Sequence, residues 1–287
     1  MFKYLMQIIG VFLLILLVSG LPIMFGIDDE RDVVFRPEVL VIQSADLLTD
    51  LSQGTLGTYW IGRTERSIAD DLVSFTEQSF ILLLSSLLIA VISSIVFGLF
   101  LHHNRLSRGV KRVLDFLSTI PDFIMIMFFL VGAIAFYQMT DIRLITLSPF
   151  AEGGLRLWFP IVVLSIGPTI FLLKMVDLKY YQVGGEDYIR TALAKGLAIR
   201  HIQLHHVYKN IKPFLVADLK KAIAITIANL FVVEYLLNVS GITRFIFGDY
   251  AFATAAIGLG VLLLLSVLIY GLIRGILYLF ERGFIYE

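Results

Sequence analysis

Six long apolar runs dominate this 287-residue chain and constrain what it can fold into. An α-helix rises about 1.5 Å per residue, so about 20 apolar residues cross a hydrocarbon layer of roughly 30 Å. The runs cover residues 4–25, 75–101, 113–139, 157–173, 214–239 and 251–273. Charged residues make up 16% of the chain, against about 25% in soluble proteins. We therefore predict an all-α, polytopic membrane protein with six transmembrane helices.

Two of the runs need comment. The fourth contains Pro160 and Pro168, and we expect its helix to extend past Lys174, whose ammonium can reach back to the lipid headgroups. The first run follows Lys3 and could be a signal peptide. However, it is longer than the usual apolar region of about 7 to 15 residues, and no clear small-residue cleavage site follows. We expect an uncleaved anchor.

Basic residues are distributed unevenly between the two sides of this topology. With a cytoplasmic amino terminus, 16 of the 23 lysines and arginines fall in inside segments. The loop 27–71 holds four arginines against ten acids, which suits an outer face. The positive-inside rule thus predicts that both termini are cytoplasmic. We divide the chain into residues 1–71, an N-terminal helix with an external loop, and residues 72–287, a membrane domain.

A polar loop, residues 184–213, interrupts the apolar pattern on the predicted cytoplasmic side. Its residues 186–195 begin with acids and end with lysine, which complements a helix dipole, and Gly196 follows as a C-terminal cap. A second helix is expected from 198 to 211, ending before Pro213. The residues alone favour two interpretations equally: an amphipathic hairpin on the membrane surface, or a dock for a soluble partner.

Several stretches resemble a known family. The run EDYIRTALAKGL, continuing to His206 and Asn210, is similar to the cytoplasmic loop of binding-protein-dependent ABC importer permeases, in the dipeptide, oligopeptide and nickel branch. GTLGTYWIGRTERSIADDL at 54–72 resembles the segment before the second span of the first permease subunit type. The stretch around Pro121 and Phe123, and VVEYLLNVSGI at 232–242, resemble parts of the third and fifth spans.

The resemblance implies a type I ABC importer permease fold and half of a translocation pathway for peptides or a related small solute. It implies that the loop couples to a separate ATPase through residues Glu186, Asp187, Tyr188, Arg190, Thr191, Ala192, Ala194, Lys195 and Gly196. The implied partners are a second homologous permease, two cytoplasmic ATP-binding subunits and an extracytoplasmic substrate-binding protein, in the plasma membrane of a prokaryote. ATP and magnesium would belong to the ATPases, and this chain would need no cofactor.

Three polar residues in the apolar runs are candidates for the translocation pathway. An acid near the bilayer centre costs about 2.5 to 3.5 kcal/mol, so Glu234 must face protein or water. It either meets a cationic group of the substrate or is hydrogen-bonded near the outer interface. We expect Asn229, about one turn earlier, to share its face. Asp122 follows Pro121 and is either a gate residue or a local repair of the bend.

Other activities find little support in the sequence. The chain has no cysteine and no G-x-x-x-x-G-K-[ST] motif, so we expect no P-loop ATP hydrolysis in it and do not predict an enzyme. His201 and His205 are four residues apart, with His206, His102 and His103 also on the inner side, but no acid stands near to complete a metal site. A secondary transporter or a membrane scaffold remains the alternative.

Overall fold

The structure is a computed structural model that describes residues 2–27, 32–61, 63–102, 104–144, 157–248 and 251–285. Its backbone forms two compact units, and each unit takes residues from two parts of the chain. The first unit consists of Met1–Ser79 with Ser240–Leu265, and the second of Phe80–Val239 with Ser266–Glu287. The long helices α3 and α11 contribute to both units.

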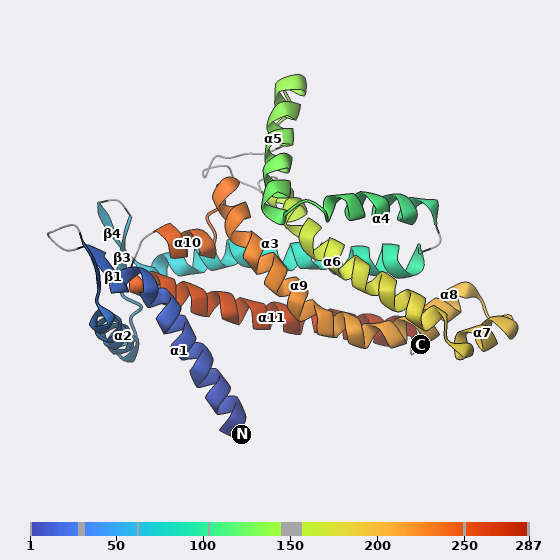
Figure 1. The fold of residues 1–287 in the computed structure, drawn as a ribbon, viewed down its shortest axis with the longest axis horizontal. Helices are drawn as coiled ribbons and strands as arrows, with labels where there is room; N and C mark the ends of the chain where they lie inside the picture. Colours follow the sequence, from blue (N-terminus) through green and yellow to red (C-terminus); the bar gives the residue numbers. More distant parts are fainter. Residues whose placement is uncertain are drawn as a thin grey trace. The chain divides into compact units, whose positions relative to one another are not determined.

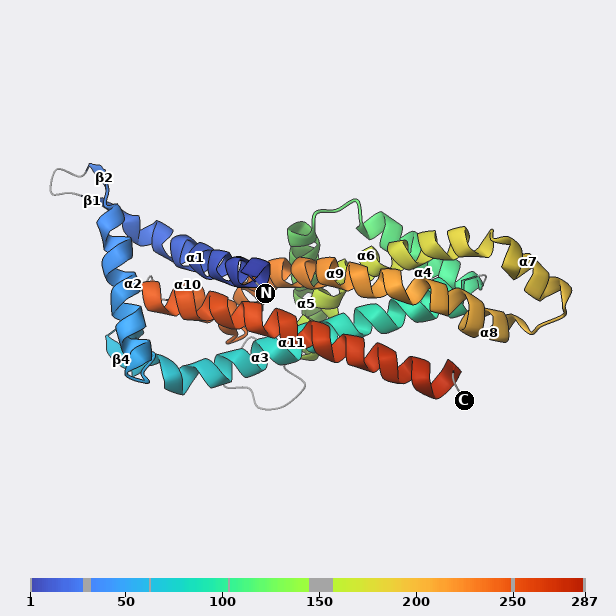
Figure 2. The ribbon, with the colours of Figure 1, turned by 90° about the horizontal axis from the view of Figure 1, so that it is seen from below.

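The first unit combines helices with two short hairpins. Its elements are α1 (Phe2–Met24), β1 (Phe25–Ile27), β2 (Val33–Phe35), α2 (Pro37–Ser52), β3 (Thr58–Ile61), β4 (Thr64–Ser67), the start of α3 (Ile68–Ile95), α10 (Ile242–Gly248) and the start of α11 (Phe252–Ile285). Both strand pairs are antiparallel, with Gly26 opposite Val34 and Tyr59 opposite Arg66. Figure 2 shows α1 passing through the first hairpin into α2.

Close helix packing and one buried polar contact hold this unit together. A Cβ on Gly20 of α1 would lie 2.2 Å from Leu40 Cδ1 of α2, so glycine permits their close approach. The Tyr59 hydroxyl donates a hydrogen bond to Asp71 Oδ2 over 2.7 Å, and Arg66 pairs with the other oxygen over 2.7 Å. This contact ties the second hairpin to the first turn of α3.

The second unit is entirely helical among its described residues. Its elements are the rest of α3, the π-helical turn η1 (Val96–Phe100), α4 (Arg105–Leu117), α5 (Asp122–Thr140), α6 (Trp158–Gly184), α7 (Asp187–Ala194), α8 (Ile199–Ile202), the π-helical η3 (Gln203–Tyr208), α9 (Lys209–Leu236) and the rest of α11. Helices α6 and α9 lie side by side, and α7 and α8 join their ends (Figure 1).

Small residues and side-chain hydrogen bonds allow close packing in the second unit. A Cβ on Gly98 of η1 would lie 2.7 Å from Val176 Cγ1 of α6, so the backbone of η1 packs directly against this side chain. The Ser86 hydroxyl of α3 donates to the Ile161 carbonyl of α6 over 3.0 Å. A partly buried Lys212–Glu281 ion pair joins the start of α9 to the end of α11. These contacts bind helices that are far apart in the sequence.

Five helices in the described part of the chain are long and apolar enough to cross a membrane: Leu5–Met24, Ile68–Phe100, Asp122–Thr140, Trp158–Gly184 and Phe252–Gly283. The expected extension of the fourth span past Lys174 is confirmed. The fifth expected span, 214–239, lies in α9 as far as Leu236, where the helix ends; α9 is long enough to cross a membrane but carries Lys220, Lys221 and Glu234 in its apolar part. Its length therefore agrees with a span, although its composition alone does not place it among the five.

The expected third span was wrong at its beginning. Residues 113–117 belong to α4, a separate helix with one strongly basic face, and the span starts at Asp122. Pro121 lacks an amide hydrogen and disfavours a helical conformation in the residue before it. The chain therefore leaves α4 through a turn at 118–120 and restarts as α5.

The expected end of the second loop helix was also wrong. Instead of ending before Pro213, the helix runs from Ile199 through η3 and α9 without a break. A proline inside a helix loses one backbone hydrogen bond and crowds the carbonyl four residues earlier, at a cost of about 3 kcal/mol that packing can offset. Burial of Ile211 and Leu215 on either side holds the helical path across that position.

Candidate functional site

Helix α7 forms the first half of the loop 184–213. Glu186 is its N-cap residue in an extended conformation, and Asp187 lies in its first turn, where a negative charge favours the helix dipole. The guanidinium of Arg190 lies 3.6 Å from Asp187 Oδ1, with both side chains exposed. The Thr191 hydroxyl donates to the Asp187 carbonyl over 2.9 Å. The polar groups of α7 thus bond only locally and stay available to a partner.

The end of α7 has the capping geometry that the sequence predicted. Gly196 has a φ of +75°, a left-handed conformation that favours glycine. Its amide donates to the Leu193 carbonyl over 2.9 Å, and the Leu197 amide donates to the Ala192 carbonyl over 3.3 Å. This pair of bonds is a Schellman motif. It fixes the turn between α7 and α8.

The two faces of α7 differ. Ile189 and Ala192 are buried, whereas Tyr188, Leu193, Ala194 and Lys195 are exposed to solvent. Partial desolvation of its hydroxyl raises the pKa of Tyr188 although the side chain as a whole is exposed, and the nearby negative charge of Glu186 adds to this effect. Exposed apolar side chains continue beyond the turn at Leu197 and Ile199. The loop therefore presents a mixed apolar and charged surface.

The loop histidines stack instead of converging on an ion. The rings of His201 and His205 are 4.0 Å apart and nearly parallel, and His206 lies 6.3 Å from both His201 and Tyr188. His102 lies in a different cluster, and His103 is outside the described residues. Within the described ranges, no group of three or more histidine, aspartate and glutamate residues could hold a metal ion.

Two of the three pathway candidates meet directly. Asn229 Nδ2 of α9 donates to Asp122 Oδ2 of α5 over 2.8 Å. Gly167 of α6 faces both, because a Cβ there would lie 3.2 Å from Asn229 Nδ2 and 3.4 Å from Asp122 Oδ2. Three helices thus converge on one carboxylate, which is only partly buried.

We expected Glu234, the third candidate, to share a helix face with Asn229, but it does not. The helix turns about 100° per residue, so five residues along α9 rotate the side chain by about 140° net. Glu234 is fully buried, and its carbonyl accepts a hydrogen bond from the Val239 amide over 2.9 Å. It therefore belongs to the packed end of α9, apart from the Asp122–Asn229 pair.

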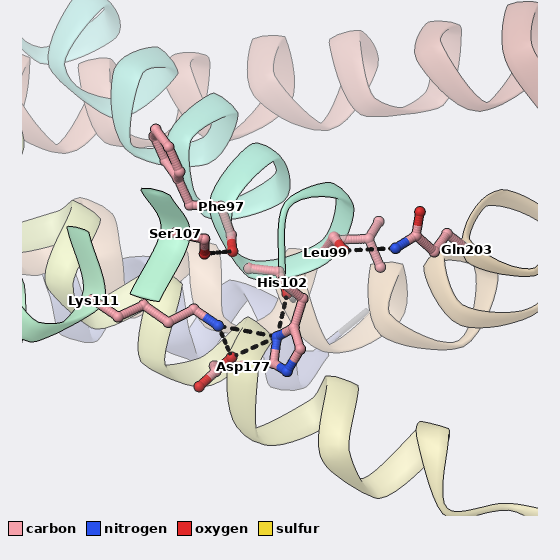
Figure 3. A network of polar contacts seen from close by, with 8 residues as sticks. Phe97, Leu99, His102, Ser107, Lys111, Asp177 and Gln203 are labelled. Carbon is pink, nitrogen blue, oxygen red and sulfur yellow. Dashed lines mark hydrogen bonds and ion pairs between the residues drawn. The ribbon is translucent and has the colours of Figure 1, made fainter. Parts of the chain in front are cut away.

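A third polar cluster, which the sequence analysis did not identify, lies beside η1. His102 Nδ1 is 2.9 Å from Asp177 Oδ1, 3.1 Å from the Gly98 carbonyl and 3.0 Å from Lys111 Nζ. Lys111 also forms an ion pair with Asp177 (Figure 3). The Asp177 carboxylate and the Gly98 carbonyl are both hydrogen-bond acceptors, so the tautomer with a proton on Nδ1 suits this position best. His102 is 4% exposed and stacks on Tyr180.

The same cluster holds three consecutive carbonyls of the π-helical turn. The Ser107 hydroxyl donates to the Phe97 carbonyl over 2.6 Å, and Gln203 Nε2 donates to the Leu99 carbonyl over 3.1 Å. Figure 3 shows these side chains gathered around the turn. We call the set the η1 network: the carbonyls of residues 97–99 with His102, Ser107, Lys111, Asp177 and Gln203.

The sequence offered only a weak signal for the η1 network. Its members come from four elements, and Gln203 is 104 residues away from the carbonyl that it binds. Asp177 could have been noticed, because it is an acid in a helix that extends the fourth apolar run. No spacing rule links it to His102 or Lys111.

Most of the chain matches a known protein family. The family model described as "Binding-protein-dependent transport system inner membrane component" matches residues 86–282. This region includes the loop 184–213, the Asp122–Asn229 pair and the η1 network.

Two curated relatives are similar to the chain. The dipeptide transport system permease protein DppB of Bacillus subtilis is 27% identical over 195 residues, covering 64% of this chain and 59% of the relative. The probable peptide ABC transporter permease protein y4tP of Sinorhizobium fredii is 31% identical over 96 residues, covering 33% of this chain and 31% of the relative. The matches thus span less than two thirds of either relative.

Proposed function

This chain belongs to the family of inner membrane components of binding-protein-dependent transport systems, and we propose that it is a permease subunit of an ATP-driven importer of peptides. The observation that carries the proposal is the surface of α7, an exposed helix closed by a Schellman turn at Gly196 inside the family region. The names of both relatives refer to transport of dipeptides or peptides. They support the peptide as substrate class.

In this proposal the loop 184–213 docks into a separate ATPase. The chain's own residues provide the surface: Glu186, Asp187, Tyr188, Arg190, Thr191, Ala194 and Lys195 are exposed, while Ala192 anchors α7 and Gly196 shapes its end. ATP and magnesium would bind in that ATPase. A hairpin on the membrane surface does not require the rigid turn at Gly196. A docking element benefits from it, because a fixed shape lowers the conformational entropy that is lost on binding.

The proposed assembly follows the family pattern. A second homologous permease completes the pathway, two ATPases bind on the inner side, and an extracytoplasmic protein delivers the substrate. The excess of basic residues on the loop side supports cytoplasmic termini in a prokaryotic plasma membrane.

The chemistry of transport would be a change of conformation without covalent steps. ATP-bound ATPase subunits contact one arrangement of the coupling loops better than the other, so ATP shifts the population toward it. Closure of the ATPases would bring the two loops together and rock the helices from an inward-facing to an outward-facing state. The Asp122–Asn229 pair and Glu234 are the polar residues of this chain that we propose for the pathway.

Uptake measurements in a strain that lacks this chain test the function. We expect the strain to lose accumulation of radiolabelled di- and tetra-alanine, and the restored chain to return it. Vanadate should abolish this uptake, whereas a protonophore should leave it in place while ATP is maintained. Uptake that stops with the protonophore and persists in vanadate would indicate a secondary transporter instead.

Substitution of Glu234 tests its place in the pathway. Glu234→Gln should lower the uptake of these peptides while the amount of assembled complex stays constant. Unchanged uptake in this variant would remove Glu234 from the pathway and leave it a packing residue.

A further inference from the structure

We propose that the π-helical turn η1 is the joint that passes movement of the loop 184–213 to helix α3, with Gln203 and Asp177 as its positioning residues. The inference rests on the proposed function, because it requires an ATPase that moves the loop. It assigns a role to the η1 network.

Two segments hold the same turn, one that leads into the loop and one within its second half. Helix α6 leads into the loop, and its Asp177 binds His102, which follows η1, and Lys111 of α4. The segment η3 belongs to the loop, and its first residue, Gln203, binds the Leu99 carbonyl within η1. A displacement of the loop therefore reaches η1 through Gln203 itself and through the adjoining helix α6.

The contacts of Gln203 and His102 are buried, which makes it costly to shift them. Gln203 is 6% exposed and His102 4% exposed, so water cannot readily replace a hydrogen bond that either side chain loses. Such a loss is much more costly than losing a bond on the surface. At Gly98 the backbone of η1 also touches Val176 of α6, which leaves no space for independent sliding.

A π-helical turn is suited to this position. It has one residue more per hydrogen-bonded ring than an α-helix and is found frequently at functional sites. In η1 the carbonyls of residues 97, 98 and 99 are each held by a side chain. The side chains thus fix the end of α3 to the two loop segments, while the remainder of α3 continues as a regular helix.

The test uses the absence of cysteine in this chain. Cysteines introduced at Ile92 of α3 and Ile199 of α8, both exposed, accept spin labels without any background from the permease. The distance between the two labels is measured in the complex with its ATPases, first without nucleotide and then trapped with ATP and vanadate. Because the joint is rigid, we expect this distance to stay the same in both states.

Substitutions in the network should break this rigidity. Gln203→Leu keeps the volume and removes the donor, and Asp177→Asn removes the charge. In both variants we expect the distance between the labels to change on trapping, and the peptide taken up per ATP hydrolysed to fall by about fivefold or more. Asp177→Glu should restore most of the uptake per ATP.

Lys174→Gln is the matched control. Lys174 also joins α6 to α4, through Ser118 at 2.7 Å and Asp115 at 3.5 Å, but it does not touch η1. We expect this variant to retain both the constant label distance and the uptake per ATP. A loss in Lys174→Gln equal to that in Asp177→Asn would overturn the proposal.

Two further outcomes would also contradict the joint. A label distance that changes in the unsubstituted complex would show that the loop moves independently of α3. A parallel fall in assembly, ATP hydrolysis and uptake in the network variants, with their ratio constant, would make the network only a stabilising contact. Failure of the ATPases to co-purify with the unsubstituted chain would instead contradict the proposed function.

Discussion

Helix α7 and the η1 network both lie in the second unit but are built in opposite ways. On α7 the charged side chains are exposed and bond only within the helix, as the Arg190–Asp187 pair does at 3.6 Å. In the η1 network the polar side chains are buried or partly buried and connect different elements, as Gln203 of η3 does when it binds the Leu99 carbonyl of η1. This difference suits two tasks. The exposed surface of α7 can bind and release a partner protein, whereas the η1 network can pass a movement of that surface to other helices.

The largest effect is expected where the interior is tightest. Gly98→Ala places a methyl group 2.7 Å from Val176 Cγ1, and overpacking of this kind costs about 1–3 kcal/mol. We expect a clearly lower unfolding temperature of the detergent-solubilised protein and a strong loss of peptide uptake. Thermal unfolding and uptake assays measure these effects.

Two variants control this prediction. Gly109→Ala in α4 meets no atom within 4 Å, so it should not destabilise the protein and should raise its stability slightly, because alanine favours a helix more than glycine does. The double variant Gly98→Ala with Val176→Ala should recover most of the lost stability. Equal stability of Gly98→Ala and Gly109→Ala would contradict the close approach of η1 and α6.

The next largest effect concerns the shape of the exposed surface. Gly196→Ala puts a side chain on a residue with a φ of +75°, at a cost of about 1–2 kcal/mol. This cost corresponds to a loss of about 5- to 30-fold in the population of the docked loop. ATPase co-purification should fall accordingly. Gly184→Ala, at the end of α6 with no atom within 4 Å, should bind the ATPase normally.

Charge on the same surface should matter less for binding than for coupling. Replacement of both Glu186 and Asp187 by lysine removes the acids at the α7 N-terminus, each worth about 0.3–1 kcal/mol to the helix. We expect ATP hydrolysis to continue while uptake per ATP falls. Glu38→Lys, in the first turn of α2 outside this loop, is the control. Normal coupling in the double variant would count against the docking surface.

The smallest effect is expected from a buried hydroxyl at the base of α9. Tyr208 is 1% exposed, its hydroxyl has no hydrogen-bond partner among the described residues, and burial with the charge of Glu281 raises its pKa to about 12. Its removal in Tyr208→Phe should therefore leave the free energy of unfolding at pH 7 unchanged or up to about 1 kcal/mol higher.

The pH dependence gives this prediction a sign. The unfolded chain releases the Tyr208 proton near the ordinary pKa of 10.0, whereas the folded chain retains it until about pH 12. The folded state therefore binds more protons between these values, and stability falls as the pH rises through them. Tyr208→Phe should lose this part of the slope in unfolding experiments. An unchanged slope would place the hydroxyl in water.

Local signals explain what could be predicted from the sequence. The acids at 186–187 and Gly196 act on their own helix, so α7 and its cap were predicted correctly. The apolar runs predicted the membrane helices, because span length depends only on bilayer thickness. Pro121 and Pro213 look equivalent in sequence, yet one starts a helix and the other lies inside one. The packing around each proline determines whether the helix continues through it, and this packing depends on residues that are far away in the sequence.

The η1 network could not be predicted for the same reason. Ser107 of α4 and Gln203 of η3 reach the η1 carbonyls only because their whole segments follow a particular path. A shift of α6 by one residue would turn Asp177 away from His102 by about 100°. The Asp122–Asn229 contact spans 107 residues and has the same origin. Sequence indicated that these polar residues were unusual in apolar runs, but the fold determines which of them meet.

Site-specific photocrosslinking tests the docking surface most directly. A photoreactive amino acid at Leu193 of α7 or at Leu48 of α2 replaces an exposed leucine in either case. In membranes that contain the complete transporter, we predict that Leu193 crosslinks to an ATP-binding subunit and that Leu48 does not. Crosslinking of Leu193 to lipid alone would contradict the account and identify the loop 184–213 as a membrane-surface hairpin.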